Sequence, residues 1–94
     1  GINVSPAEIE EVLIRHNAVE LAYVIGLEDP RRDEIVAAVV VAREKIEADD
    51  LLAPCREILA AYKMPRRLIF VDHGDLPLTG TGKLQKNRLK ELFK

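Results

Sequence analysis

Aromatic side chains are scarce in this chain of 94 residues, which contains no tryptophan, two tyrosines and two phenylalanines. So few aromatic faces argue against a platform on which nucleic-acid bases stack, and we expect no nucleic-acid partner. Cys55 is the only cysteine, so no disulfide can form within the chain, which fits a reducing, cytoplasmic location. The longest apolar run, residues 35–42, is far shorter than the roughly 20 residues of a membrane span.

The chain also lacks an initiator methionine and a signal-like segment of basic and then apolar residues. It begins at Gly1, directly before a helix-capping signal, so we expect a fragment whose upstream part is missing. Its length suits one small domain spanning residues 1–94.

Charge is unevenly distributed. Residues 1–62 carry 6 basic and 13 acidic side chains, whereas residues 63–94 carry 8 basic and 3 acidic ones. The C-terminal third therefore attracts anions. A solvated amphipathic tail would give the same pattern, so charge alone assigns no function.

Ser5, Pro6 and Glu8 predict the start of a helix. They supply a capping side chain, a proline at the first helical position and a glutamate that completes a capping box. Residues 19–27 and 35–43 are interpreted as two strands, and the second is rich enough in valine to be buried on both faces. The short polar connection between them predicts an antiparallel pair.

A second helix is expected to start at Asp49 or Asp50 and to reach Tyr62. Pro54 is expected to loosen its first turn, or else the regular helix starts nearer Pro54 itself. Its inward residues are expected to be Leu51, Leu52, Cys55, Ile58 and Leu59. Residues 67–72 predict a third strand, and a short helix begins at about residue 85. The inward residues of that helix are expected to be Leu89, Leu92 and Phe93. The order α-β-β-α-β-α predicts an α+β fold with a small mixed sheet of about three strands flanked by three helices.

Two glycines and two threonines surround a lysine in residues 77–86, Pro-Leu-Thr-Gly-Thr-Gly-Lys-Leu-Gln-Lys. Such a backbone adopts conformations that other residues avoid and can lay the Lys83 ammonium beside a phosphate or carboxylate. The segment is not a P-loop, since Pro77 replaces the required glycine and Leu84 the hydroxyl residue that would bind magnesium. Lys83 would act as a mobile point charge. A bare Gly-Lys pair is more often a solvated turn.

Other candidates are weaker. His16 and His73 have no cysteine or acid cluster at ligand spacing, so no metal site is predicted. Cys55 is interpreted as part of the core, because no histidine partner is suggested. The acidic group at the first helix start is favoured by the helix dipole and needs no catalytic role: Glu8, Glu10 and Glu11. Three basic residues fit either surface charge or a hold on a phosphate tail: Lys63, Arg66 and Arg67.

Four motifs resemble, in order, the C-terminal domain of the adenylate-forming (acyl-CoA synthetase, AMP-binding enzyme) superfamily. They are Asn-Val-Ser-Pro-Ala-Glu-Ile-Glu at 3–10, Ala-Tyr-Val-Ile-Gly-Leu-Glu-Asp at 22–29, Ala-Tyr-Lys-Met-Pro-Arg at 61–66 and Pro-Leu-Thr-Gly-Thr-Gly-Lys at 77–83. The superfamily includes acyl-CoA synthetases, peptide-synthetase adenylation domains and firefly luciferase. Each motif is weak alone, but their order along the full chain makes the resemblance specific.

The resemblance implies an ATP-dependent acid–CoA ligase of the cytoplasm, with fatty acid metabolism as its setting. A carboxylic acid and ATP give an acyl-adenylate and pyrophosphate, and the CoA sulfur then displaces AMP. A large N-terminal domain of the same chain is implied to hold ATP and acid, with Mg²⁺ bound outside the present domain. The C-terminal domain is implied to be a lid that rotates between the steps, so the isolated 94 residues are not expected to be active.

Residue roles carry over with the motifs. Lys83, presented by Thr81 and Gly82, is implied to contact the reacting oxygens in the first step. After rotation, Gly1 is implied to leave the pantetheine tunnel open, and Asn3 to bond a pantetheine amide. The same carry-over implies that the CoA phosphates meet Arg66.

The chain departs from the family pattern at two places. Arg32-Asp33 replaces a common Trp-Gly, which removes an aromatic contact with the nucleotide end of CoA, and Lys86 stands where arginine is usual. Residues 62–65 and 77–83 are more similar to acyl-CoA synthetases than to peptide-synthetase domains. The alternatives are an adenylation domain that loads a carrier protein, a free-standing anion-binding module and a purely structural lid.

Overall fold

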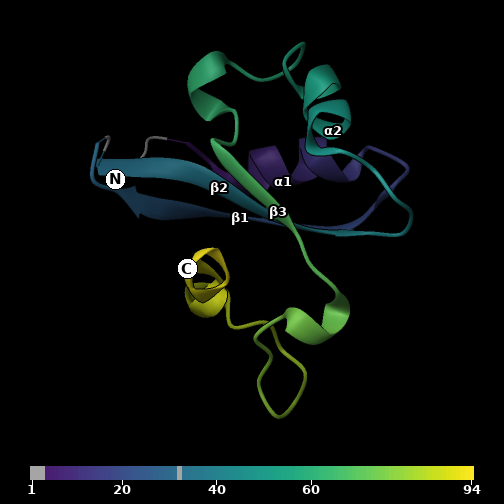
Figure 1. Cartoon of the computed structure of the whole chain (residues 1–94), viewed down its shortest axis with the longest axis vertical. Coiled ribbons are helices and arrows are strands. Elements are labelled where there is room, and N and C mark those ends of the chain that lie inside the picture. The colour runs from purple at the N-terminus through teal and green to yellow at the C-terminus, as the bar shows by residue number, and fades with distance from the viewer. Residues whose placement is uncertain (1–3, 32) are drawn as a thin grey trace.

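The structure, a computed structural model, describes residues 4–31 and 33–94. Its elements, in chain order, are α1 (Pro6–Ile14), β1 (Val19–Asp29), β2 (Asp33–Ala42), α2 (Ala48–Cys55), η1 (Ala61–Lys63), β3 (Arg67–Phe70), η2 (His73–Asp75) and η3 (Lys86–Phe93), where η denotes a 3₁₀ helix. The sheet forms a middle layer, with α1 and α2 on one side and η3 on the other (Figure 1). The predicted α+β fold is confirmed.

The three strands lie in the order β1-β2-β3, with β1 antiparallel and β3 parallel to the central strand β2. Val39 of β2 lies opposite Tyr23 of β1 and Ile69 of β3. The residues from Ile35 to Val41 are all 6% exposed or less. Burial of the second strand on both faces, predicted from its valines, is therefore correct.

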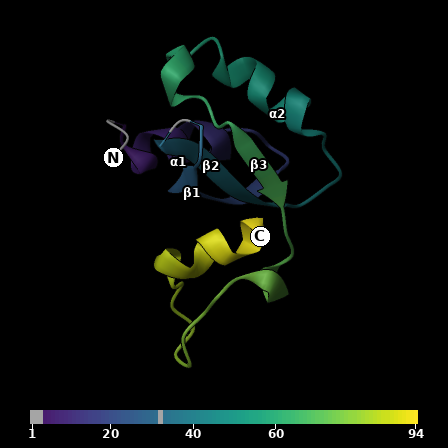
Figure 2. The ribbon, with the colours of Figure 1, turned by 60° about the vertical axis from the view of Figure 1, so that its left-hand side comes forward.

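Alternate residues of β2 belong to two cores. Val36, Ala38 and Val40 pack with α1 and α2, whereas Ala37 and Val39 pack against η3. This division follows from the two-residue period of a strand. Figure 2 shows η3 running beneath the sheet, so the C-terminal segment covers a face that the two α-helices leave open.

The second helix is shorter than predicted: α2 ends at Cys55 and does not reach Tyr62. Pro54 has no N–H to donate to the fourth residue before it, and the chain then tightens into turns such as Ile58 N–H to the Cys55 carbonyl, 3.0 Å. Ile58, which we expected to face inward, is 55% exposed as a result.

The cap of α1 is confirmed, since the Ser5 side chain accepts a hydrogen bond from the Glu8 N–H at 3.4 Å. The other half of the predicted capping box, in which the Glu8 carboxylate would accept the Ser5 N–H, is wrong. The Glu8 carboxylate accepts hydrogen bonds from Lys63 instead. The predicted cap of α2 is wrong, because Glu47 occupies the N-cap position. Asp49 and Asp50 lie in the first turn, where the helix dipole also favours them.

Other boundaries move by a few residues. β1 extends to Asp29, and β3 ends at Phe70 rather than at residue 72. The last helix starts at Lys86, close to its predicted start, but it is a 3₁₀ helix, and Leu89 and Phe93 are buried as expected. Within the described ranges, no helix has the length and apolar character that crossing a membrane requires.

Candidate functional site: the lysine loop

Residues 77–86, called here the lysine loop, double back on themselves below η3. Leu78 and Leu84 form an isolated antiparallel bridge at its base. Gln85 adds two bonds, its N–H to the Pro77 carbonyl at 2.7 Å and its side-chain amide to the Leu78 carbonyl at 3.1 Å. The two limbs of the loop are therefore fastened together, so Lys83 projects from a backbone of defined shape.

Threonine and glycine shape the tip of the loop. Thr79 donates its N–H to the Lys83 carbonyl at 2.7 Å and accepts the Gly82 N–H at 2.9 Å. Its hydroxyl accepts the Lys83 N–H at 3.1 Å and lies 3.1 Å from the Thr81 hydroxyl. Gly82 has a φ of 87°, in the left-handed region that only glycine adopts readily. Residues 79–82 therefore form a turn, with Thr81 at its centre and Gly82 at its end, directly before Lys83.

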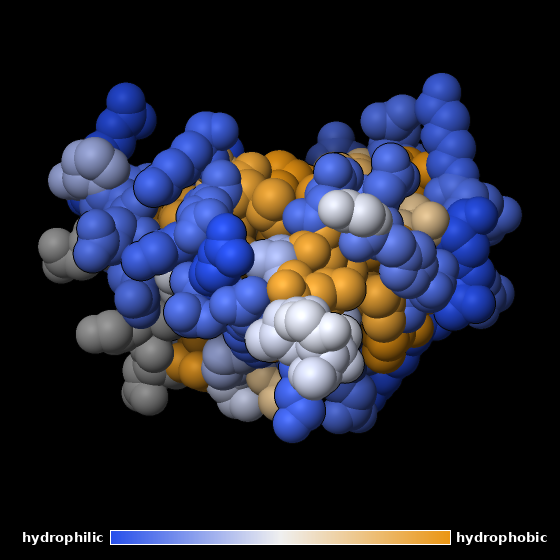
Figure 3. Space-filling view, turned by 90° about the horizontal axis from the view of Figure 1, so that it is seen from below, coloured by the Kyte–Doolittle hydropathy of each residue, from blue (hydrophilic) through white to orange (hydrophobic). Residues whose placement is uncertain are grey.

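Lys83 is exposed. Among residues 4–31 and 33–94, none forms a hydrogen bond or an ion pair with its ammonium. Two other lysines differ, because Lys63 and Lys86 are paired with glutamates. A cation without an internal counter-ion can meet an anion from outside the domain. Seen from below, hydrophilic side chains surround apolar areas near the centre of this face (Figure 3).

Arg66 lies on the other side of the sheet, so the structure does not bring it near Lys83. Its N–H donates to the Val36 carbonyl at 2.8 Å. Its exposed side chain borders a cavity of about 400 Å³ between α2 and η1 that Arg56 also lines. The two arginines place positive charge on this second face. Gly1 and Asn3 lie outside the described residues.

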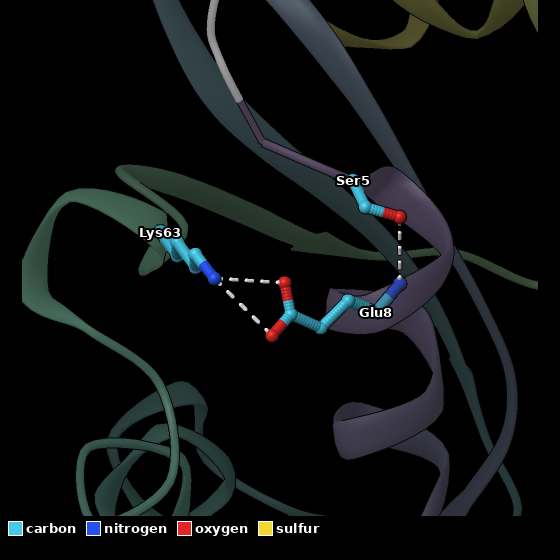
Figure 4. A network of polar contacts seen from close by, with 3 residues as sticks. All are labelled: Ser5, Glu8 and Lys63. Carbon is cyan, nitrogen blue, oxygen red and sulfur yellow. Dashed lines mark hydrogen bonds and ion pairs between the residues drawn. The ribbon is translucent and has the colours of Figure 1, made fainter.

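The ammonium of Lys63 forms an ion pair within the domain. Figure 4 shows its ammonium between both carboxylate oxygens of Glu8, at 3.0 and 3.2 Å, beside the turn that Ser5 caps. The hydrogen bond from Lys63 to Glu8, reinforced by the carboxylate charge, raises the pKa of Lys63. Of the two roles left open for this lysine, the structure therefore favours the structural one, a tie between η1 and α1.

This tie gives the stability of the chain a pH dependence. The pKa of Lys63 is raised above its ordinary value of 10.5, so the pair contributes fully below that pH and the contribution is lost as pH rises through the folded-state pKa. A Lys63→Met variant should be less stable than the unmodified chain at neutral pH. The difference in unfolding free energy between the two should shrink at strongly alkaline pH. Guanidinium unfolding at several pH values measures the difference.

The matched control removes a cation that does not titrate. Arg15 pairs with Glu11 at 3.4 Å on the exposed face of α1, and an arginine stays protonated throughout this range. The stability difference for Arg15→Met should therefore stay flat. If the stability difference for Lys63→Met were equally independent of pH, the ion pair between Lys63 and Glu8 would not be the source of the pH dependence.

Cys55 belongs to the core, as the sequence suggested. It is 2% exposed, and its thiol donates to the Leu51 carbonyl at 3.4 Å. Burial raises the pKa of the thiol, which disfavours the nucleophilic thiolate. His73 lies with its Nε2 2.8 Å from a carboxylate oxygen of Glu20, a contact that no sequence signal indicates.

Residues 8–83 match the family model of the AMP-binding enzyme C-terminal domain. The chain therefore belongs to this family, the C-terminal domains of the adenylate-forming enzymes. The resemblance inferred from the four motifs is thus confirmed.

Two curated relatives are CoA ligases by name. The 2-succinylbenzoate–CoA ligase of Bacillus pumilus (strain SAFR-032) is 46% identical over 90 residues, covering 96% of this chain and 18% of the relative. The feruloyl-CoA synthase of Amycolatopsis sp is 43% identical over 95 residues, covering 99% and 19%. The ATP-bound structure of MatB from Rhodopseudomonas palustris matches with a TM-score of 0.87 at 40% identity, covering 100% of this chain and 19% of that one. The chain thus spans under a fifth of each relative.

Proposed function

We propose that residues 1–94 are the mobile C-terminal domain of an ATP-dependent acid–CoA ligase, and that Lys83 is its catalytic residue in acyl-adenylate formation. The observation that carries the proposal is the exposed ammonium of Lys83, without an internal partner among the described residues, on a loop closed by its own hydrogen bonds. Its occurrence in a family whose relatives include named CoA ligases adds support.

The first step brings two anions together. The acid carboxylate attacks the α-phosphorus of ATP, pyrophosphate leaves, and the acyl-adenylate forms. Negative charge gathers on the reacting oxygens, and an ammonium placed beside them stabilises that arrangement more than the separated substrates. Lys83 supplies this charge, while a large N-terminal domain of the same chain would hold ATP, its Mg²⁺ and the acid. The isolated chain would have no measurable activity.

The second step would use another face of the domain. CoA sulfur attacks the acyl carbon, its thiol proton is lost, and AMP leaves; after the proposed rotation Lys83 would no longer lie beside the reacting atoms. Arg66 faces away from the lysine loop, beside Arg56, and a rotation that withdraws Lys83 could present this pair to the CoA phosphates. Gly1 and Asn3 would line the pantetheine tunnel, an assignment that rests on the family resemblance alone.

Gly1→Leu tests the tunnel. A branched side chain there should block the pantetheine arm, so thioester formation from supplied acyl-adenylate and CoA should fall about tenfold or more. Pyrophosphate release from acid and ATP should change little. The measurement is made on the full-length enzyme that contains this domain, called here the parent chain, by following the rate of each half-reaction separately. A Gly1→Leu variant that loses neither rate would contradict the assignment.

The function as a whole is tested by incubating the parent chain with ATP, CoA and a panel of short-chain, long-chain and aryl acids. We expect an acyl-CoA product and AMP with at least one acid, in a cytoplasmic enzyme whose setting is fatty acid metabolism. An acyl group delivered only to a carrier protein would instead identify the carrier-loading alternative. Salt-dependent affinity for polyanions, with no thioester from any acid, would identify an anion-binding module.

A further inference from the structure

Glu10 joins the lysine loop to the rest of the domain. Its Oε2 accepts a hydrogen bond from Lys86 Nζ at 2.7 Å and another from the Val24 N–H at 2.8 Å. Glu10 lies on α1, Val24 on β1, and Lys86 at the end of the lysine loop. One carboxylate oxygen therefore ties together three segments, two of which are 76 positions apart in the sequence.

A backbone hydrogen bond from β1 fixes the position of the Glu10 carboxylate. β1 is an edge strand of the described sheet, so within the described part of the chain no strand faces the Val24 N–H on the side away from β2, and Val24 is 0% exposed. A buried N–H needs a partner, and Glu10 provides it. The Glu10 side chain is 23% exposed and that of Lys86 44%, so water screens this pair less than a fully exposed one.

The pair lies close to Lys83 along the chain. Leu84 and Gln85, the residues between Lys83 and Lys86, are bonded to the opposite limb of the lysine loop. A shift of Lys86 therefore moves both limbs together. Before the loop, the contact between His73 and Glu20 of β1, 2.8 Å, makes a second attachment to the same strand. Polar contacts to the α1–β1 unit, an ion pair at Lys86 and a hydrogen bond at His73, thus hold both ends of the segment that carries Lys83.

We propose that Glu10 is a positioning residue for acyl-adenylate formation: through Lys86 it fixes the orientation from which the lysine loop presents Lys83. This inference rests on the proposed role of Lys83. Glu10 touches no substrate and acts only through the loop. Loss of the tether should therefore lower the rate of the adenylation step and leave the affinity for ATP and the second step unchanged.

The test uses two variants of the parent chain. Glu10→Gln keeps an oxygen for the Val24 N–H but removes the charge that holds Lys86, and Lys86→Met removes the ammonium but keeps a similar stem. Each should lower kcat for pyrophosphate release by about tenfold to a hundredfold, up to the loss expected when a catalytic group is misplaced by roughly 1 Å but still present, with KM for ATP unchanged. Thioester formation from supplied acyl-adenylate should match the parent. The double variant should lose no more than either single one, and Lys86→Arg should retain parental activity.

Glu11→Gln is the matched control, because it lies next to Glu10 on α1 and removes only the exposed pair with Arg15. It should leave both half-reactions unchanged. Hydrogen exchange of residues 77–86 in the parent chain gives a readout besides activity. Exchange should be faster in Glu10→Gln and in Lys86→Met, and parental in Glu11→Gln.

Two outcomes separate this inference from the proposed function. In the first outcome, Glu10→Gln and Lys86→Met behave like Glu11→Gln while Lys83→Ala strongly slows adenylation. This result would overturn the positioning role alone. A Lys83→Ala variant with parental adenylation would overturn the function of the loop and the positioning role with it.

Discussion

Replacing Lys83 with alanine is expected to slow acyl-adenylate formation by about a hundredfold to a thousandfold, the loss typical when a donor to developing negative charge is removed. The side chain is exposed and, among the described residues, bonded to none, so its removal should not disturb the fold. The measurement is pyrophosphate release by the parent chain supplied with ATP and its acid.

Lys90→Ala is the matched control for this prediction. Lys90 is also an exposed lysine of the basic C-terminal third, located on η3 rather than on the lysine loop. Its loss changes the net charge by the same amount, so a general electrostatic effect would appear in both variants. Lys90→Ala should remain within about twofold of the parent chain, as for a surface substitution away from the site. Equal losses in the two variants would contradict a local role for Lys83.

Truncating Leu89 to alanine should be the most damaging of the stability changes considered. Leu89 is 0% exposed and joins η3 to Ala37 and Val39 of β2. Leu→Ala changes at such sites cost about 2–5 kcal/mol, a large part of the roughly 5–15 kcal/mol by which a domain is stable. Guanidinium unfolding of the 94-residue chain measures this change.

Leu78→Ala is the same substitution at a residue that is 48% exposed. It should cost less than about 1 kcal/mol, since little apolar surface returns to water. If Leu89→Ala costs no more than Leu78→Ala, then η3 does not seal the second face of the sheet. The lysine loop would in that case lack the packed support that its position between β3 and η3 provides.

Local chemistry made much of the fold predictable. Ser5 and Pro6 mark a helix start without reference to the rest of the molecule, and the valines of β2 indicate a strand covered on both sides. The end of α2 was missed because apolar spacing continues through Ile58, whereas the proline at position 54 and the packing of the chain favour tight turns. Apolar periodicity locates a buried face but does not fix the residue at which a helix stops.

The site divides in the same way. The threonines and glycines of the lysine loop could be recognised because their conformational preferences are local, and Gly82 takes the left-handed conformation that glycine permits. Two contacts could not be predicted from local preferences, because they join residues that are far apart in the sequence. Glu10 and Lys86 are 76 positions apart, and Glu20 and His73 are 53 positions apart. Glu10 was interpreted as a helix-start acid, and only the approach of the loop and of the β1 edge gives it further partners.

The most direct test of the central claim is a single-turnover measurement of the second half-reaction in the parent chain carrying Lys83→Ala, supplied with preformed acyl-adenylate and CoA. Because the ammonium is proposed to act only while two anions are brought together, thioester formation should stay within about threefold of the unmodified enzyme, although adenylation is nearly abolished. A loss of the same size in both half-reactions would contradict the account.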